Sequence, residues 1–453
     1  MSAQLRSEAV ELLQRLIRFD TVNPPGNERA AQEHLAAILA SAGFACELLG
    51  RTPERPNLVA RLDGKQPGPV LCLLSHVDTV LATPSEWGHD PWSGDLDDDG
   101  FIWGRGALDM KSQTAAEVVA GVTLARAGWR PDRGTLLIVA LADEETGGAD
   151  GAQWLTQTHP EKVRCDFLVN EGGGGIIDYD GRRLYCLGCA EKGIFRFALH
   201  TAGVAAHASM PRLGDNALLK LAPIMERFAA RQPSFRLTAE PRAFLEAIGA
   251  LEGDDAAGAL ERVRAIEPRL VALIEPMLGV SLAPTRIFAS EKINVIPSQA
   301  RLAVDCRVPA GLGEQAALEA IEEVVGAGDY RLEWTEQVMG NRSPIDSPLA
   351  QAIRGWIAEQ DPDAICVPVV LPGFTDSRTF RDAFPECAAH GFFPHRVRTR
   401  FETDQLIHGA DERIDVRDLE FATQFFRDLA PAMLGGSGHG RPAQGSAQPP
   451  TAR

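Results

Sequence analysis

Residues 73–80 read LLSHVDTV, an apolar run that ends with a histidine and an aspartate one position apart. The run up to residue 76 has the continuous apolar character of a strand that is buried on both faces of a sheet. Alternate residues of an extended chain lie on the same side, so His76 and Asp78 point in the same direction. Two side chains that bind or move protons at the end of a buried strand predict a functional site.

Strand-like runs and amphipathic helical patterns alternate around this stretch. The runs are NLVARLD, VLCLLSH, TLLIVALAD and CDFLVNE, and helices are expected at about 5–18, 27–44 and 112–128. This order predicts an α/β fold with a mainly parallel sheet covered by helices. Ligands of such sheets gather beyond the carboxyl ends of the strands. Several polar residues fall there: His76, Asp78, Asp143, Glu144, Glu145 and Glu171.

The pattern changes near residue 192. Strands and helices then follow in the order β-α-β-β-α-β of a ferredoxin-like module, with a helical elaboration at 233–283. We therefore expect four parts: a catalytic domain at 1–191 and 343–435, an inserted α+β lid or dimerisation domain at 192–342, and a disordered tail at 436–453.

Composition excludes some classes of partner. The formal charge of −17 argues against nucleic acid or an anionic membrane surface. No stretch reaches the roughly 18 apolar residues of a membrane span. The first residues form an amphipathic helix rather than a signal peptide, so we expect a cytoplasmic location. The eight scattered cysteines, including the lone pair Cys186 and Cys189, are expected to be reduced and mostly buried thiols.

Six motifs carry candidate ligands: SHVDTV, GRGALDMKS, ADEETGG, VNEGGG, VAAHASMP and IHGADERI. Each alone has an ordinary interpretation, such as a surface hydrogen-bond pair, a solvated loop or a turn. Together they offer two imidazoles and three carboxylates, which suit zinc or a similar divalent ion. One shared carboxylate suits two ions about 3.5–4 Å apart.

In this order, over residues of about 7 to 435, the motifs resemble the co-catalytic zinc amidohydrolases and exopeptidases. That family includes succinyl-diaminopimelate desuccinylase, acetylornithine deacetylase, aminoacylase and glutamate carboxypeptidase. The resemblance implies His76 and Glu171 as ligands of one zinc, Glu145 and His408 as ligands of the other, and Asp109 as the bridge. It also implies Asp78 as the carboxylate that orients His76, Glu144 as the general base, and a cis bond after Asp109.

Further roles implied by the resemblance concern the inserted module and the substrate. His207 would reach the active site of a partner subunit and stabilise the oxyanion, which implies a homodimer. Asn294 would help bind substrate across the dimer, and Arg307 fits the following strand or pairs with a nearby carboxylate. Arg378, in PGFTDSRTF, would grip a substrate carboxylate with two parallel hydrogen bonds.

The resulting prediction is a dinuclear metal-dependent hydrolase that cleaves an amide bond next to a free carboxylate. Its substrate is a small peptide or an N-acyl amino acid, so dipeptidase, carboxypeptidase and deacylase activities stay open, as does an esterase or lactamase side activity. Zinc is the expected metal, and cobalt or manganese can share such a site. The alternatives are a catalytically silent metal-binding protein on the same fold and a dinuclear phosphoesterase.

Overall fold

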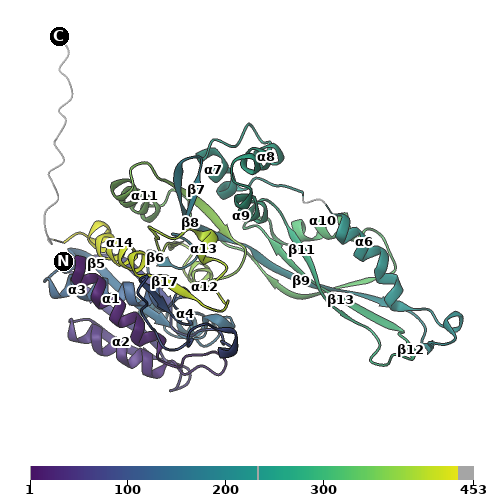
Figure 1. Ribbon diagram of the computed structural model, residues 1–453, viewed down its shortest axis with the longest axis horizontal. Coiled ribbons are helices and arrows are strands. Elements are labelled where there is room, and N and C mark those ends of the chain that lie inside the picture. The colour runs from purple at the N-terminus through teal and green to yellow at the C-terminus, as the bar shows by residue number, and fades with distance from the viewer. Residues whose placement is uncertain (1, 232–233, 437–453) are drawn as a thin grey trace, which may run out of the picture.

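The computed structural model describes residues 2–231 and 234–436. Its centre is a nine-stranded sheet (Figure 1). The path through the sheet is β1 (Ala45–Leu49), β2 (Asn57–Asp63), β5 (Arg133–Leu141), β3 (Gln66–His76), β6 (Phe167–Asn170), β16 (Ala388–Gly391), β8 (Arg182–Glu191) and β15 (Ile365–Leu371), and β7 (Ile176–Tyr179) pairs with β8. All but Gly436 of the predicted tail lies outside the described residues.

The middle of this sheet is parallel. Strands β5, β3, β6 and β16 run in one direction, and β15 runs parallel to β8. Antiparallel pairs are β1 with β2, β2 with β5, β16 with β8, and β7 with β8. The predicted mainly parallel α/β fold is therefore confirmed, with antiparallel strands added around it.

Helices cover both faces of the central sheet. Helices α1 (Ser2–Ile17), α3 (Lys111–Arg126) and α14 (Val416–Leu434) share one core with alternate residues of β5, such as Ile138. The intervening residues, such as Val139, share another core with α4 (Ala152–Thr158) and α12 (Asp376–Ala383). Burial on both faces explains why these strands read as unbroken apolar runs.

The strand register brings three strand ends to one edge. His76, the last residue of β3, pairs with Leu141, the last residue of β5. On the other side of β3, Leu73 pairs with Val169 of β6. The residues that follow β3, β5 and β6 therefore meet at the same edge, as the sequence predicts.

A separate four-stranded antiparallel sheet extends away from the central one (Figure 1). Its order is β11 (Ser281–Phe288), β13 (Gln299–Val308), β9 (Gly193–Ala202) and β14 (Arg331–Val338). One face packs on α6 (Ala222–Ala230) and α10 (Gly313–Val325). Along the chain these elements follow the expected order β9-α6-β11-β13-α10-β14.

The helical elaboration belongs with the central sheet in its packing. Helices α7 (Ala239–Ala247), α8 (Ala256–Ile266) and α9 (Pro268–Leu278) share a core with β8 and β15. At the junction, the buried Lys192 donates hydrogen bonds to the carbonyl oxygens of Pro276 and Gly279. The division of the chain into domains at 191/192 and 342/343 stays a prediction.

The remaining elements complete the described chain. They are α2 (Arg29–Ser41), α5 (Pro160–Val163), α11 (Pro348–Gln360), α13 (Arg400–Thr403), the two-stranded pairs β4 (Phe101–Trp103) with β17 (Arg413–Asp415) and β10 (Ala206–His207) with β12 (Val295–Ile296), and four 3₁₀ turns at Pro84–Glu86, Glu144–Thr146, Pro211–Leu213 and Ala217–Leu221. Among the described helices, none combines the length and apolarity needed to span a membrane. All eight cysteines are free thiols and most are buried, as expected.

Candidate dinuclear metal site

Three strand ends and two loops supply the predicted ligands. His76 ends β3, Glu144 and Glu145 begin the 3₁₀ turn after β5, and Glu171 follows β6. Asp109 lies just before α3, next to a cis peptide bond to Met110, as the resemblance implied. His408 lies in the loop between α13 and β17, where its φ of 59° is in the left-handed region.

His76 is the centre of the first cluster and is buried, with 1% of its side chain exposed. Its Nε2 atom lies 3.3 Å from Asp109 Oδ1 and 3.8 Å from Glu171 Oε1. It also lies 3.9 Å from Glu144 Oε2. These atoms are close enough to share one metal ion, and the sets His76, Glu144, Glu171 and His76, Asp109, Glu145 each have their ligand atoms within 4.8 Å of one another.

Asp109 connects this cluster to a second one. Its other oxygen, Oδ2, lies 3.2 Å from His408 Nε2, and the same His408 atom lies 3.1 Å from Glu145 Oε2. Asp109 thus presents one oxygen to each cluster. This is the arrangement that a bridging carboxylate between two ions requires.

Two buried atoms support a metal at this place. His76 Nε2 and Asp109 Oδ1 are both inaccessible and have no hydrogen-bond partner among the described residues. Buried polar atoms without a partner are rare in folded proteins, and an ion is one of the groups that satisfy them. Two imidazoles and several carboxylates are a donor set that zinc accepts. The residues present therefore fit a pair of divalent cations.

The pKa values of the site reflect the crowding of its charges. Burial and the neighbouring Glu171 raise the pKa of Glu144 well above its usual value. Hydrogen bonds with Asp109 and Glu145 raise the pKa of His408 to about 10. Burial also raises the pKa of Glu171, with Asp109 as the next cause. Carboxylates this close repel one another, and bound cations would relieve that repulsion.

Asp78 organises the site through its backbone and its carboxylate. His76 Nδ1 lies 3.0 Å from the carbonyl oxygen of Asp78 and 3.5 Å from its carboxylate. The carboxylate accepts hydrogen bonds from the backbone N–H groups of Glu144 at 3.2 Å and Glu145 at 3.1 Å. Asp78 therefore contacts both the loop of Glu144 and Glu145 and the imidazole of His76.

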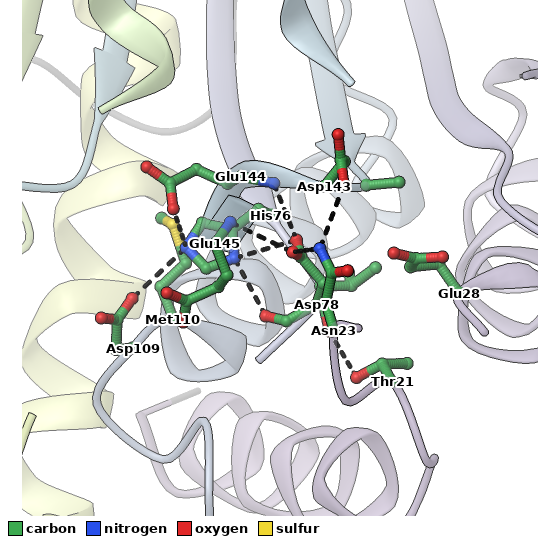
Figure 2. Close-up of polar contacts among 12 residues, drawn as sticks. Thr21, Asn23, Glu28, His76, Asp78, Asp109, Met110, Asp143, Glu144 and Glu145 are labelled. Atoms are coloured by element: carbon green, nitrogen blue, oxygen red, sulfur yellow. Dashed lines mark hydrogen bonds and ion pairs between the residues drawn. The ribbon is translucent and has the colours of Figure 1, made fainter. Parts of the chain in front are cut away.

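Asn23 is a buried residue beside the site that the sequence analysis missed. Its amide nitrogen donates to Asp78 Oδ2 at 2.8 Å and to Asp143 Oδ1 at 3.1 Å, so it joins two buried carboxylates (Figure 2). It lies in the segment between α1 and α2, which follows no strand in the sequence, and no ligand motif contains it. The turn NPPG was the available signal, but it indicates loop geometry rather than a hydrogen-bond role.

The glycine-rich turn after Glu171 packs directly on the segment 391–393. A side chain at Gly174, whose φ is 87°, would collide with the backbone of Phe393, and one at Gly173 with the carbonyl of Gly391. Glycine is the residue that permits both the close approach and the positive φ. The turn thereby fixes where Glu171 leaves β6.

A cavity of about 440 Å³ opens over both clusters. One part of its wall is apolar, and includes Val369, Leu371 and Phe374 near the end of β15. The part around α13 is polar, and includes Arg400 and Asp404, which form an ion pair at 2.8 Å. Such a cavity has room for a small substrate with an apolar and a polar portion.

The predicted substrate-binding residues lie outside the lining of this cavity. Arg378 is 3.2 Å from Asp382 and lies over the ring of Phe374, which does line the cavity. Arg307 pairs with Asp305 at 2.7 Å, the simpler of the two roles expected for it. Asn294 is exposed beside β12.

His207 lies at the far end of the four-stranded sheet. It is exposed in β10, where it pairs with Val295 of β12, and its Nδ1 is 2.8 Å from Ser209 Oγ. Figure 1 shows β12 at the end of that sheet remote from the central sheet. In this conformation, His207 therefore contributes nothing to the site of its own chain.

The chain belongs to peptidase family M20/M25/M40, whose model matches residues 72–432. The resemblance recognised from the six motifs is thereby confirmed.

Individual relatives carry different names. The chain is 25% identical over 378 residues to a probable carboxypeptidase S-like 2 of Dictyostelium discoideum, covering 80% of this chain and 71% of that protein. It is 30% identical over 231 residues to succinyl-diaminopimelate desuccinylase of Wolbachia sp. subsp. Brugia malayi (strain TRS), covering 49% of this chain and 54% of that enzyme. The chain thus spans about half the length of this desuccinylase.

Solved structures share the fold. One is a dinuclear metal binding peptidase of the M20 family from Bacillus subtilis. Its TM-score is 0.61 at 14% identity, and the match covers 95% of this chain and 99% of that one.

Proposed function

We propose that this protein is a dinuclear metal-dependent hydrolase that cleaves an amide bond next to a free carboxylate. The observation that carries the proposal is the convergence of His76, Asp109, Glu145, Glu171 and His408 around two points joined by Asp109. Glu144 lies beside them in the same cavity. Zinc is the proposed metal.

Glu144 is the proposed general base. Its backbone is fixed by the hydrogen bond to Asp78, and its carboxylate lines the cavity within 4 Å of His76. In this role, a Glu144 oxygen takes a proton from the attacking water and then delivers it to the nitrogen of the leaving amine. Bound divalent cations would supply polarisation of the amide carbonyl and a lower pKa of water.

The other five residues are the proposed metal ligands. His76 and Glu171 would bind one ion, Glu145 and His408 the other, and Asp109 both. An amide substrate is favoured over a phosphate ester because a base glutamate adjoins a ligand glutamate and the chain belongs to a peptidase family.

The substrate is proposed to be a small peptide or an N-acyl amino acid. The relatives named above include a carboxypeptidase and a desuccinylase, and both names imply a carboxylate near the scissile amide. Arg378 is the proposed carboxylate-binding residue, because its guanidinium lies against Phe374 at the cavity wall. Arg307 and Asn294 are proposed to assist from the inserted module.

A homodimer is part of the proposal. Apolar side chains are exposed on β11, in or next to the two 3₁₀ turns Pro211–Leu213 and Ala217–Leu221, and in the loop before β12: Met210, Leu213, Leu219, Ile287, Phe288 and Ile293. A second copy would cover them. It would also bring His207 to a site that the same chain's histidine does not reach.

The test is a panel of dipeptides and N-acyl amino acids, assayed with the zinc-loaded protein and with Glu144→Gln. We expect turnover of at least one substrate, a drop in kcat of about 10²–10⁴-fold in the variant, and two bound ions in both proteins. Exposed Glu359→Gln is the control. A metal-bound, folded protein inactive on the whole panel would favour the silent metal-binding alternative.

A further inference from the structure

The carboxylate of Glu412 is enclosed by donors from the segment that carries Asp109. Glu412 Oε1 accepts hydrogen bonds from the backbone N–H groups of Leu108 at 2.6 Å and Asp109 at 3.0 Å. Its Oε2 accepts one from Gly106 N–H at 3.1 Å and another from Arg105 Nη1 at 2.7 Å. Glu412 is fully buried, and hydrogen bonds to an ionised acceptor are about twice as strong as neutral ones.

Arg105 extends the same contact to the segment that carries His408. Its Nη2 donates to the carbonyl oxygen of Gly409 at 2.9 Å and lies 3.4 Å from that of His408. Arg105 is itself buried, with 3% of its side chain exposed. The pair therefore fastens two ligand segments together, although Asp109 and Glu412 are 303 positions apart in the sequence.

His408 has particular need of such a support. Its side chain is 52% exposed, so packing does not hold it, and its backbone φ of 59° is one that histidine rarely adopts. The orientation of the His408 side chain therefore depends on the conformation of the loop backbone. The contacts of Arg105 with Gly409 and His408 are made to that backbone.

We infer that the buried pair Arg105–Glu412 positions Asp109 and His408 for the ion bound by Asp109, Glu145 and His408. The inference rests on the dinuclear site of the proposed function. The pair acts through the two ligands and does not touch the ion, because both oxygens of Glu412 are already occupied by donors. His76 and Glu171 lie on other segments, so their ion depends on the pair only through the shared Asp109.

The experiment is a calorimetric titration of the metal-stripped protein with Zn²⁺. In Glu412→Gln, an NH₂ group would replace one of the two oxygens that accept hydrogen bonds from residues 105–109. We therefore expect one of the two binding steps to weaken by about 10–100-fold. Arg105→Lys keeps the charge but cannot reach Glu412 and Gly409 together, so it should weaken the same step. If Glu412→Gln does not fold, Arg105→Lys decides.

Glu240→Gln is the matched control, because Glu240 is also a buried glutamate, 3.4 Å from Arg342, but lies in α7 away from the ligands. It should leave both steps unchanged. Folded Arg105→Lys or Glu412→Gln protein that binds both ions within threefold of the parent would overturn the inference. A parent protein that binds no pair of ions would instead contradict the proposed function.

Discussion

At the residue scale, Asp78 contacts the loop of Glu144 and Glu145 as well as the imidazole of His76. Its carboxylate accepts from Asn23 and from two backbone N–H groups, while its carbonyl lies closest to His76 Nδ1. The sequence spacing predicted that His76 and Asp78 would meet, because alternate strand residues share a side. It could not predict that the carboxylate would turn toward the Glu144 loop, because that loop is 66 positions away.

Asp78→Asn is expected to lower metal affinity by about 10–100-fold and to lower kcat further. The backbone N–H groups of Glu144 and Glu145 donate to the two carboxylate oxygens of Asp78. In the variant, one of these oxygens is replaced by an NH₂ group that cannot accept, so the loop of Glu144 and Glu145 would shift. Zinc titration and steady-state kinetics measure the two effects. Exposed Asp346→Asn should change neither. An Asp78→Asn protein with parental affinity and kcat would contradict this role.

His408 and Glu412 show where residue-scale prediction from sequence ends. His408 follows no strand and has a left-handed backbone, so apolar periodicity gives no reason to select it, and the family motif was needed. Glu412 lies four positions after His408, and no sequence pattern identifies it as a functional residue. Its function depends on N–H groups from the segment 106–109, which only the folded chain brings near.

At the element scale, the buried helix α3 contains a glutamate, Glu117, that has no ion-pair partner among the described residues. Glu117 is fully buried, accepts one hydrogen bond from Gln113 at 2.8 Å, and has Oε2 without a partner among the described residues. Burial raises its pKa to about 8. The folded protein therefore holds this proton up to about pH 8, whereas the unfolded chain releases it near pH 4.5.

This difference predicts a pH-dependent stability. Between about pH 4.5 and 8 the folded state binds more protons at Glu117, so its contribution to stability falls as pH rises, by at most ~1.4 kcal/mol per pH unit. Glu117→Gln removes that slope, so its stability relative to the parent should increase from pH 5 to pH 8. Urea unfolding at several pH values measures it, with Glu359→Gln as control. The prediction would be refuted if the free energy of unfolding changed with pH in the same way in Glu117→Gln and in the parent.

Several elements with a long apolar pattern were predicted, although the ten-residue strand β8 was not. The expected strands at 57–63 and 70–76 correspond to β2 and to the end of β3, and the expected helix at 112–128 is α3. Strands β1 and β16 have five and four residues and show no clear period, so they were missed. Their pairing with β2 and β6 decides their conformation, which is a tertiary effect.

At the scale of the whole molecule, the order of elements predicted both sheets, but not where the helices between them would pack. Segment 239–278 follows α6 in the chain, yet its apolar residues face β8 and β15. Sequence order indicates which elements exist, while shape and apolar area decide which sheet they cover.

A homodimer is the expected state in solution. Sedimentation equilibrium should give twice the chain mass of 48.9 kDa. Leu213→Glu, at a position 69% exposed in the 3₁₀ turn that contacts β10, should shift the protein to monomer and lower kcat, because His207 of the partner subunit would be lost. A monomeric parent with full activity would contradict both the dimer and the role of His207.

The most direct test of the central claim is turnover as a function of bound metal. The protein is stripped with a chelator, metal content is measured, and zinc is added back in steps while hydrolysis of the best panel substrate is followed. We predict no turnover without metal and recovery as the site of His76, Asp109, Glu145, Glu171 and His408 fills with two ions. Turnover that persists in the fully stripped protein would contradict the account.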